Sequence, residues 1–175
     1  MKKIAIIGLS PTHDQAPWDD PDWELFGLAL DPDVWRLDRV FEIHDIRLLK
    51  TYPDWQQYRS RMLDLEWVYV QHEVEEIPNG RAYPLAEVSK TTDYLCSSVA
   101  YMLALAIHEG ATEIGIWGVD MAAWEEYGYQ RANMEYLIGL ARGKGIKVYV
   151  PAQSPLLKFQ SDPDCKYRGR YGWLG

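Results

Sequence analysis

The sequence predicts an α/β protein in three layers, built on a mainly parallel, doubly wound sheet. Three observations support this fold class. A short apolar strand at 3–7 opens the chain and stops at Gly8, a common beginning for such folds. From 94 to 156, helical runs and strands alternate, and each strand leads into a polar loop. The length of 175 residues suits one core and is short for two. We therefore expect one Rossmann-like domain over 1–160, followed by a C-terminal tail over 161–175.

The first half of the chain combines short strands with polar or irregular segments. Strands are predicted where apolar residues run together or alternate, at 3–7, 39–43 and 67–71. The segment 23–30 fits a short strand and a helical turn equally well. Residues 8–14 are predicted to form a polar loop, and 55–62 a polar helix. Turn-forming residues at 77–80 and 83–84 predict a connection with little regular structure.

The second half carries stronger helix and strand signals. Ser97 or Ser98 is well placed to cap a helix that Gly110 ends. The apolar face of this helix has helical spacing and consists of Val99, Met102, Leu103, Ala106 and Ile107. A strand is predicted at 113–117, and the last strand at 146–150. Between them lies a helix over 127–142, whose apolar stripe consists of Met134, Leu137, Ile138 and Ala141.

Composition narrows the classes of function. The net charge of −8 argues against a nucleic-acid partner, because a phosphate backbone requires a basic face. The small C-terminal cluster of Lys166, Arg168 and Arg170 does not reverse that balance. Cys96 and Cys165 lack the spacing of a disulfide or zinc framework. No apolar run reaches membrane-spanning length and the start is unlike a signal peptide, so we expect a cytoplasmic protein without a membrane partner. The eight Trp and twelve Tyr predict rings at a surface, groove or subunit contact.

Polar side chains follow the carboxyl ends of the predicted strands. In an open parallel sheet these ends share one edge, and ligands bind there at the switch in strand order. Ser97 and Ser98 add a helix N-terminus, whose free N–H groups suit a phosphate. The sequence therefore predicts a nucleotide or sugar-phosphate site. The candidates at strand ends are Gly8, Ser10, Thr12, His44, Asp45, His72, Gly118, Asp120, Gln153 and Ser154.

Several candidates have a structural alternative. Ser97 or Ser98 serves as a helix cap in any case, and Asp120 fits either a cap or a ribose ligand. His44 lies beside Asp45, which could orient its ring, so this pair is the predicted catalytic group. Tyr127 and Arg131 suit a stacking ring and a phosphate partner, or merely a solvated helix start. The sequence contains no GxxxxGK[ST], GxGxxG, GxSxG or HExxH motif, so no metal and no standard kinase or NAD site is predicted.

Four segments resemble the small, single-domain bacterial sialyltransferases. Residues 8–12 resemble their Gly-x-Gly-Pro-Ser loop, and 94–102 their Thr-Ser-Gly helix start. Residues 113–121 resemble their strand ending in Gly-(Ile/Val)-Asp, and 150–156 their Pro-x-Ser-x-Leu tail. The same layout is similar to the domain of flagellin-glycosylation accessory factors and of the archaeal 6-hydroxymethylpterin diphosphokinase. It is also similar to bacteriophage proteins with a Rossmann-like domain.

The resemblance implies a nucleotide or nucleotide-sugar ligand and a glycosyltransferase-like or diphosphate-transfer enzyme of phage origin. It implies a nucleotide held by Ser10, Thr12, Ser97, Ser98, Asp120 and Ser154. The family's lid insertion, with its catalytic histidine, is missing between Asp120 and Tyr129. Two other functions therefore stay open: a non-catalytic module that sequesters or senses a nucleotide, and a phage structural or assembly protein. A second copy of the chain, or a phage or host protein, stays open as a partner.

Overall fold

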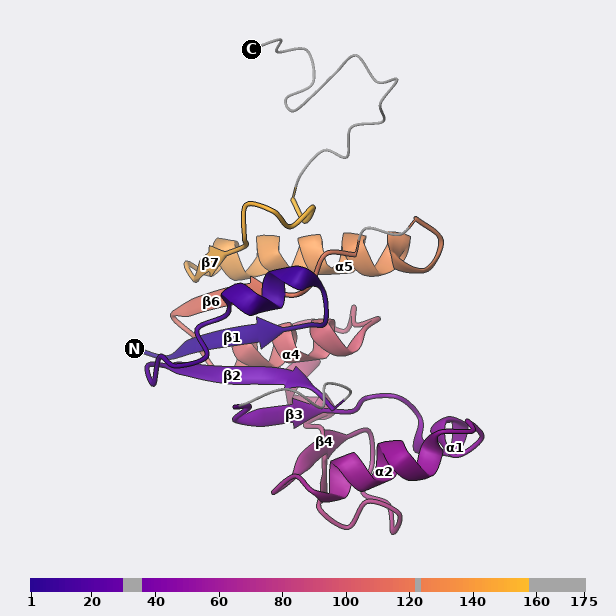
Figure 1. Ribbon diagram of the computed structural model, residues 1–175. Helices are drawn as coiled ribbons and strands as arrows, with labels where there is room; N and C mark the ends of the chain where they lie inside the picture. The colour runs from indigo at the N-terminus through magenta and orange to yellow at the C-terminus, as the bar shows by residue number, and fades with distance from the viewer. Residues whose placement is uncertain (30–35, 122–123, 158–175) are drawn as a thin grey trace.

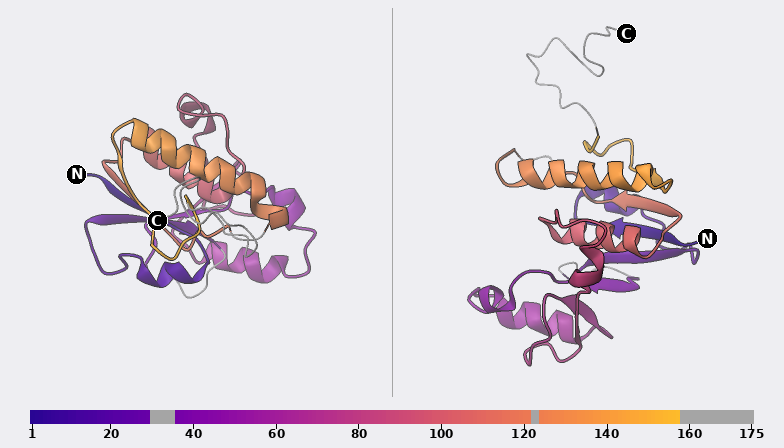
Figure 2. Two further views of the ribbon diagram at one scale, coloured as in Figure 1. Left: turned by 90° about the horizontal axis from the view of Figure 1, so that it is seen from above. Right: turned by 180° about the vertical axis from the view of Figure 1, so that it is seen from behind.

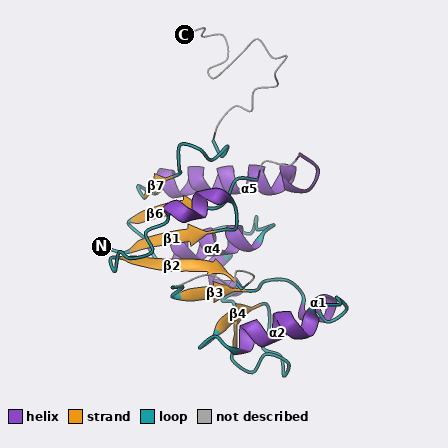
Figure 3. Ribbon diagram, viewed as in Figure 1, coloured by secondary structure: helices purple, strands orange, loops and turns teal. Residues whose placement is uncertain are grey.

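The computed structural model describes residues 1–29, 36–121 and 124–157, with the side chains of 124–127 excluded. Within these residues, one seven-stranded sheet runs in the order β5-β4-β3-β2-β1-β6-β7 (Figures 1 and 3). Every pairing in it is parallel, which confirms the predicted fold class. The strands are β1 (Lys3–Ile7), β2 (Trp23–Leu28), β3 (Arg39–Phe41), β4 (Val68–Val70), β5 (Gly80–Ala82), β6 (Glu113–Trp117) and β7 (Lys147–Tyr149).

Helices cover both faces of the sheet (Figure 2). The 3-10 helix η1 (Pro11–Gln15) and α2 (Trp55–Leu63) lie on one face, and α4 (Ser98–His108) and α5 (Trp124–Gly143) lie on the other. Two short helices, α1 (Ile46–Leu49) and α3 (Leu85–Val88), belong to the connections. None of the described helices is long and apolar enough to cross a membrane. The expected tail from 161, with its basic cluster and Cys165, lies outside the described residues.

Strand β1 shows how the sequence builds the two cores. Successive side chains of a strand point to opposite faces, so alternate residues enter different clusters. Ile4 and Ile6 pack with the residues of α4 and α5 in the larger core, whereas Ala5 and Ile7 pack with Trp117 on the η1 face. The run at 3–7 is apolar throughout because both faces of a central parallel strand are buried.

The order of connections creates a switch point beside β1. From β1 to β5 the chain adds each strand on the same side, and then α3 and α4 carry it back to place β6 on the other side of β1. Loops leaving β1 and β6 therefore run in opposite directions and leave a crevice at their carboxyl ends. Ser97 caps α4, since its Oγ accepts a hydrogen bond from the Ala100 N–H at 3.3 Å. The N-terminus of α4 opens toward this crevice.

Two predicted segments differ from the structure. The loop at 8–14 contains η1, and the connection at 77–84 contains β5, with α3 directly after it. Strand β5 has three residues and forms by pairing with β4, so it is too short to show a period of its own. The side chain of Asn79 holds it in place by donating to the carbonyls of Met62 and Leu65 at 2.8 and 2.9 Å. The segment 23–30, for which the sequence left a short strand and a helical turn open, contains the strand β2.

An ion-pair network lies at the opposite, amino edge of the sheet. Arg39 binds Glu24 and Glu109, each at 2.6 Å, and Lys2 binds Glu109 at 2.5 Å. Burial alone would raise the pKa of Glu109, but the hydrogen bonds from Arg39 and Lys2 outweigh it and hold the pKa below its ordinary value. The network thus contributes stability that depends on pH.

Glu109→Gln is expected to lower the free energy of unfolding at pH 7 by about 1–2 kcal/mol, because it weakens two charge-assisted hydrogen bonds. A lowered carboxyl pKa stabilises the fold above the unfolded value of about 4.3 and loses that effect as pH falls through the folded value. The difference between wild type and Glu109→Gln in urea denaturation should therefore shrink below about pH 4. Glu66→Gln, at an exposed position, is the control. A difference that is unchanged from pH 7 to pH 3 would contradict this account.

Candidate functional site

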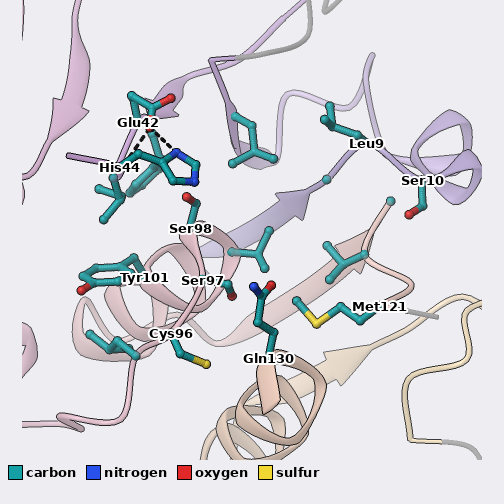
Figure 4. Close-up of a pocket in the computed structure, with 18 of the residues that line it drawn as sticks. Leu9, Ser10, Glu42, His44, Cys96, Ser97, Ser98, Tyr101, Met121 and Gln130 are labelled. Carbon is teal, nitrogen blue, oxygen red and sulfur yellow. Dashed lines mark hydrogen bonds and ion pairs between the residues drawn. The ribbon is translucent and has the colours of Figure 1, made fainter. Parts of the chain in front are cut away.

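A cleft of about 960 Å³ opens at the carboxyl edge of the sheet, over the switch point (Figure 4). Its walls come from the loops after β1, β3, β4 and β6, from the first turn of α4, and from the start of α5. This is where the topology predicts a ligand. The structure brings together seven of the residues predicted from sequence, namely Gly8, Ser10, His44, Ser97, Ser98, Gly118 and Asp120.

The loops after β1 and β6 contact each other through their backbones. The Ser10 N–H donates to the Gly118 carbonyl at 2.9 Å, and the Gly8 N–H to the Trp117 carbonyl at 2.8 Å. A Cβ on Gly8 would lie 2.3 Å from the Gly118 oxygen, and a Cβ on Gly118 2.3 Å from the Gly8 oxygen. Gly118 also has a φ of +67°. Both positions thus require glycine, and this contact sets the floor of the cleft at the switch point.

Thr12 and Ser154 lie beneath the cleft rather than in its lining. The Thr12 hydroxyl accepts a hydrogen bond from the Gly118 N–H at 2.8 Å and lies 3.4 Å from the Asp120 carboxylate, to which it donates. The Ser154 hydroxyl donates to the Val119 carbonyl at 3.2 Å. Both side chains are buried. They position the loop of Gly118 and Asp120, so their contribution to a ligand is indirect.

Three other predicted residues lie away from the cleft lining. The Asp45 carboxylate caps α1 and pairs with Arg47 at 2.7 Å, and the hydrogen bond from the Arg47 side chain lowers its pKa. The Arg131 guanidinium binds Glu135 at 2.9 Å and the Pro155 carbonyl at 2.6 Å. Gln153 is exposed in the final loop. The side chain of Tyr127 lies outside the described residues.

His44 is held by Glu42, not by Asp45. The Glu42 carboxylate is only 3% exposed, and it binds the His44 Nδ1 at 2.6 Å and the His44 backbone N–H at 2.8 Å (Figure 4). The hydrogen bond to Glu42 raises the pKa of His44, against the opposing effect of burial. Because Nδ1 is occupied, Nε2 is the ring nitrogen left for a ligand.

Sequence reasoning missed Glu42, although a local signal was present. In extended chain, side chains two residues apart point to the same side, and Glu42 precedes His44 by two positions. The other lining residues were not predicted as site residues. They are Leu9, Leu28, Phe41, Ile43, Gln71, Leu95, Cys96, Val99, Tyr101, Val119, Met121, Tyr129 and Gln130.

The cleft has a polar side and an apolar side. The polar side consists of the two glycine loops, Asp120 and the serines at the start of α4. The apolar side includes Leu28, Phe41 and Tyr101, with Tyr101 held by Tyr83, whose hydroxyl donates to the Tyr101 carbonyl at 2.9 Å. Such a division suits a ligand with an anionic group and a planar apolar group. No cluster of His, Cys, Asp or Glu that could hold a metal occurs in the part of the chain that the structure describes.

Solved structures with the same arrangement place this cleft in context. The sialyltransferase CstII from Campylobacter jejuni, in complex with the substrate analogue CMP-3FNeuAc, superposes with a TM-score of 0.57 at 16% identity, over 89% of this chain and 81% of that one. The protein shares the fold of a sialyltransferase. CstII with CMP and a trisaccharide acceptor gives the same TM-score at 12% identity, over 99% of this chain and 93% of that one.

A third solved structure, also from Campylobacter jejuni, has a similar fold. The α-2,3-sialyltransferase from Campylobacter jejuni in apo form superposes with a TM-score of 0.55 at 14% identity, over 87% of this chain and 76% of that one. Neither a protein-family model nor a curated protein sequence matches this chain. At such identities the likeness concerns the fold, and the chemistry has to be argued from the site itself.

Proposed function

We propose that the protein binds a nucleotide or nucleotide sugar in this cleft and acts on it as a transferase. The observation that carries the proposal is the position of the cleft, at the switch point between β1 and β6 and at the N-terminus of α4. The neighbours that share this fold have been crystallised with CMP and with a CMP-sugar analogue. A nucleotide placed along the cleft meets hydrogen-bond donors on one side and apolar rings on the other.

Each part of a nucleotide has a matching group. The phosphate lies at the first turn of α4, where Ser98 and the free backbone N–H groups face the cleft. The Asp120 carboxylate, braced by Thr12, accepts hydrogen bonds from ribose hydroxyls. The base packs on the apolar side near Tyr101. His44 is the residue available for proton transfer.

A nucleotide that binds this cleft will raise the melting temperature. At a ligand concentration of one hundred times Kd the stabilisation is about 2.7 kcal/mol, or roughly 5–10 °C for a domain of this size. A panel of nucleoside monophosphates, diphosphates, nucleotide sugars and cyclic nucleotides should therefore contain at least one such ligand. Ser98→Ala should raise Kd about three- to tenfold, because it removes one hydrogen bond, and should therefore reduce the shift in melting temperature. Ser60→Ala, an exposed serine on α2, should leave it unchanged. A panel without any shift would contradict the proposed function.

A non-catalytic binding protein is the second candidate. Only two residues separate Met121 from Trp124, where α5 begins, so the chain has no room there for the lid that carries the family's catalytic histidine. Mass spectrometry of the panel after incubation separates the two. A transferase cleaves the nucleotide sugar, at least by slow hydrolysis, and His44→Ala slows that cleavage even at a nucleotide-sugar concentration that saturates the variant. A sequestering protein returns every ligand intact.

A further inference from the structure

The charges lining the cleft are unusual for a nucleotide site. Among its described lining residues there is no lysine or arginine, and His44 is the one basic side chain. Two carboxylates, Glu42 and Asp120, line the same cleft, in a chain of net charge −8. A phosphate brought into this field meets repulsion that helix N–H groups only partly offset, since a helix end is equivalent to about half a charge. A cation at the phosphate would resolve this imbalance.

His44 is placed to be that cation. It follows β3 at one wall of the cleft, and Ser98 borders the same cleft from the first turn of α4 (Figure 4). Glu42 is buried and binds Nδ1, so the ring presents Nε2 outward. A protonated imidazole donates from both nitrogens, to Glu42 on one side and to a ligand on the other.

We propose that His44 binds the nucleotide phosphate as an imidazolium, with Glu42 as the positioning residue that keeps the ring oriented and protonated. The phosphate is then held between the Nε2–H of His44 and the N-terminus of α4. This inference rests on the proposed function. It gives His44 a different role in the complex from the proton transfer described above. An imidazolium has no lone pair on Nε2, so in the complex it is a hydrogen-bond donor to phosphate rather than a base.

The charged groups around His44 agree with this assignment. Asp45 and Arg47, on α1, pair with each other, and His72 at the end of β4 lies near enough to help lower the pKa of Asp45. Across the cleft Asp120 accepts from Thr12. Glu42 therefore dominates, and its hydrogen bond raises the pKa of His44 above the ordinary value of about 6.5. A raised pKa means that the proton is held to higher pH, so binding is strong at low pH and weakens as pH rises through that pKa.

Calorimetric titration with CMP-3FNeuAc from pH 5.5 to 8.5 tests the proposal, because the phosphodiester of this probe does not itself titrate in that range. Wild type should bind about ten- to a hundredfold more weakly at the high end, the range expected for losing a charge-assisted hydrogen bond. His44→Lys should bind with a flat pH profile at the affinity of the protonated wild type. His44→Ala should bind weakly at every pH, with a flat pH profile. Glu42→Gln should shift the midpoint of the pH profile of binding to lower pH. Cytidine, which lacks the phosphate, should show no such dependence.

A flat wild-type profile, or a weak His44→Lys variant, would overturn the inference. If CMP-3FNeuAc binds at no pH, the nucleotide proposal fails for that probe, and a second measurement decides on His44 alone. Sulfate stays a dianion over this range, so its effect on the His44 imidazole nitrogen resonances at pH 6 reports an anion site directly. Sulfate should move the Nε2 resonance in wild type and about as far in Ser60→Ala, but less in Ser98→Ala. If the Nε2 resonance of His44 does not move when sulfate is in 50-fold excess over any other anion, His44 binds no anion.

Discussion

Gly118→Ala should destabilise the protein by about 3 kcal/mol or more, the largest effect that we expect from a single methyl group here. Two costs add up. The φ of +67° is strained for any residue with a Cβ, and the added carbon would lie 2.3 Å from the oxygen and 2.6 Å from the carbonyl carbon of Gly8. Those atoms are backbone and belong to a central strand end, so they have no rotamer by which to move away. The loops after β1 and β6 would have to separate, and the cleft would lose its floor.

Equilibrium denaturation in urea measures this effect, and a matched glycine supplies the control. Gly139 lies on the exposed side of α5, where a Cβ meets nothing within 4 Å. Gly139→Ala should stabilise the protein by about 0.5–1 kcal/mol, because alanine is the better helix former. Opposite signs at the two positions would identify the backbone contact as the cause. A Gly118→Ala variant with the wild-type midpoint would contradict the close approach of the two loops.

Asn133→Ala should lower the free energy of unfolding by about 2–3 kcal/mol and loosen the start of α4. The Asn133 side chain is fully buried on α5. Its amide donates to the Tyr94 carbonyl at 2.7 Å, and its oxygen accepts from the Cys96 N–H at 3.3 Å. Alanine leaves both backbone groups without this partner. The segment that leads into the Ser97 cap then loses its attachment to α5.

Two measurements separate this effect from a general loss of stability. Hydrogen exchange of the amides at 94–98 should speed up more than that of the amides in β6, and nucleotide affinity should fall with it. Arg142→Ala, at an exposed position on the same helix, should change the free energy of unfolding by less than about 0.5 kcal/mol. Equal acceleration of exchange in β6 and at 94–98 would mean that Asn133 stabilises the fold without a special role in the cleft.

Local sequence patterns were sufficient for most of the elements. The apolar run at 3–7, the Ser97 cap and the apolar stripe that ends at Ala141 are each a local signal that one segment carries by itself. The strand-end rule then placed Ser10, His44 and Asp120 at one edge, because all strands are parallel. Strand β5 was not predicted from the sequence, because three residues show no period and only pairing with β4 makes them a strand.

The sequence could not predict which polar side chains bind each other. Asp45 is adjacent to His44 in the chain and Glu42 is two positions away, yet the backbone turns Asp45 onto Arg47 and leaves Glu42 buried against the ring. Thr12 and Arg131 resembled ligand residues and instead bind segments 106 and 24 positions away. Such contacts join loops that only the folded sheet brings together.

By itself, therefore, the sequence determined a parallel α/β sheet and the edge where we propose that a ligand binds, because both follow from short-range periodicity and from the polarity of strand ends. The tertiary structure decided which of those polar groups face the cleft and which are used in holding it. It also decided that His44 is the one basic side chain among the described lining residues. Hydrogen bonds and backbone contacts between distant segments make these choices, and no local pattern encodes them.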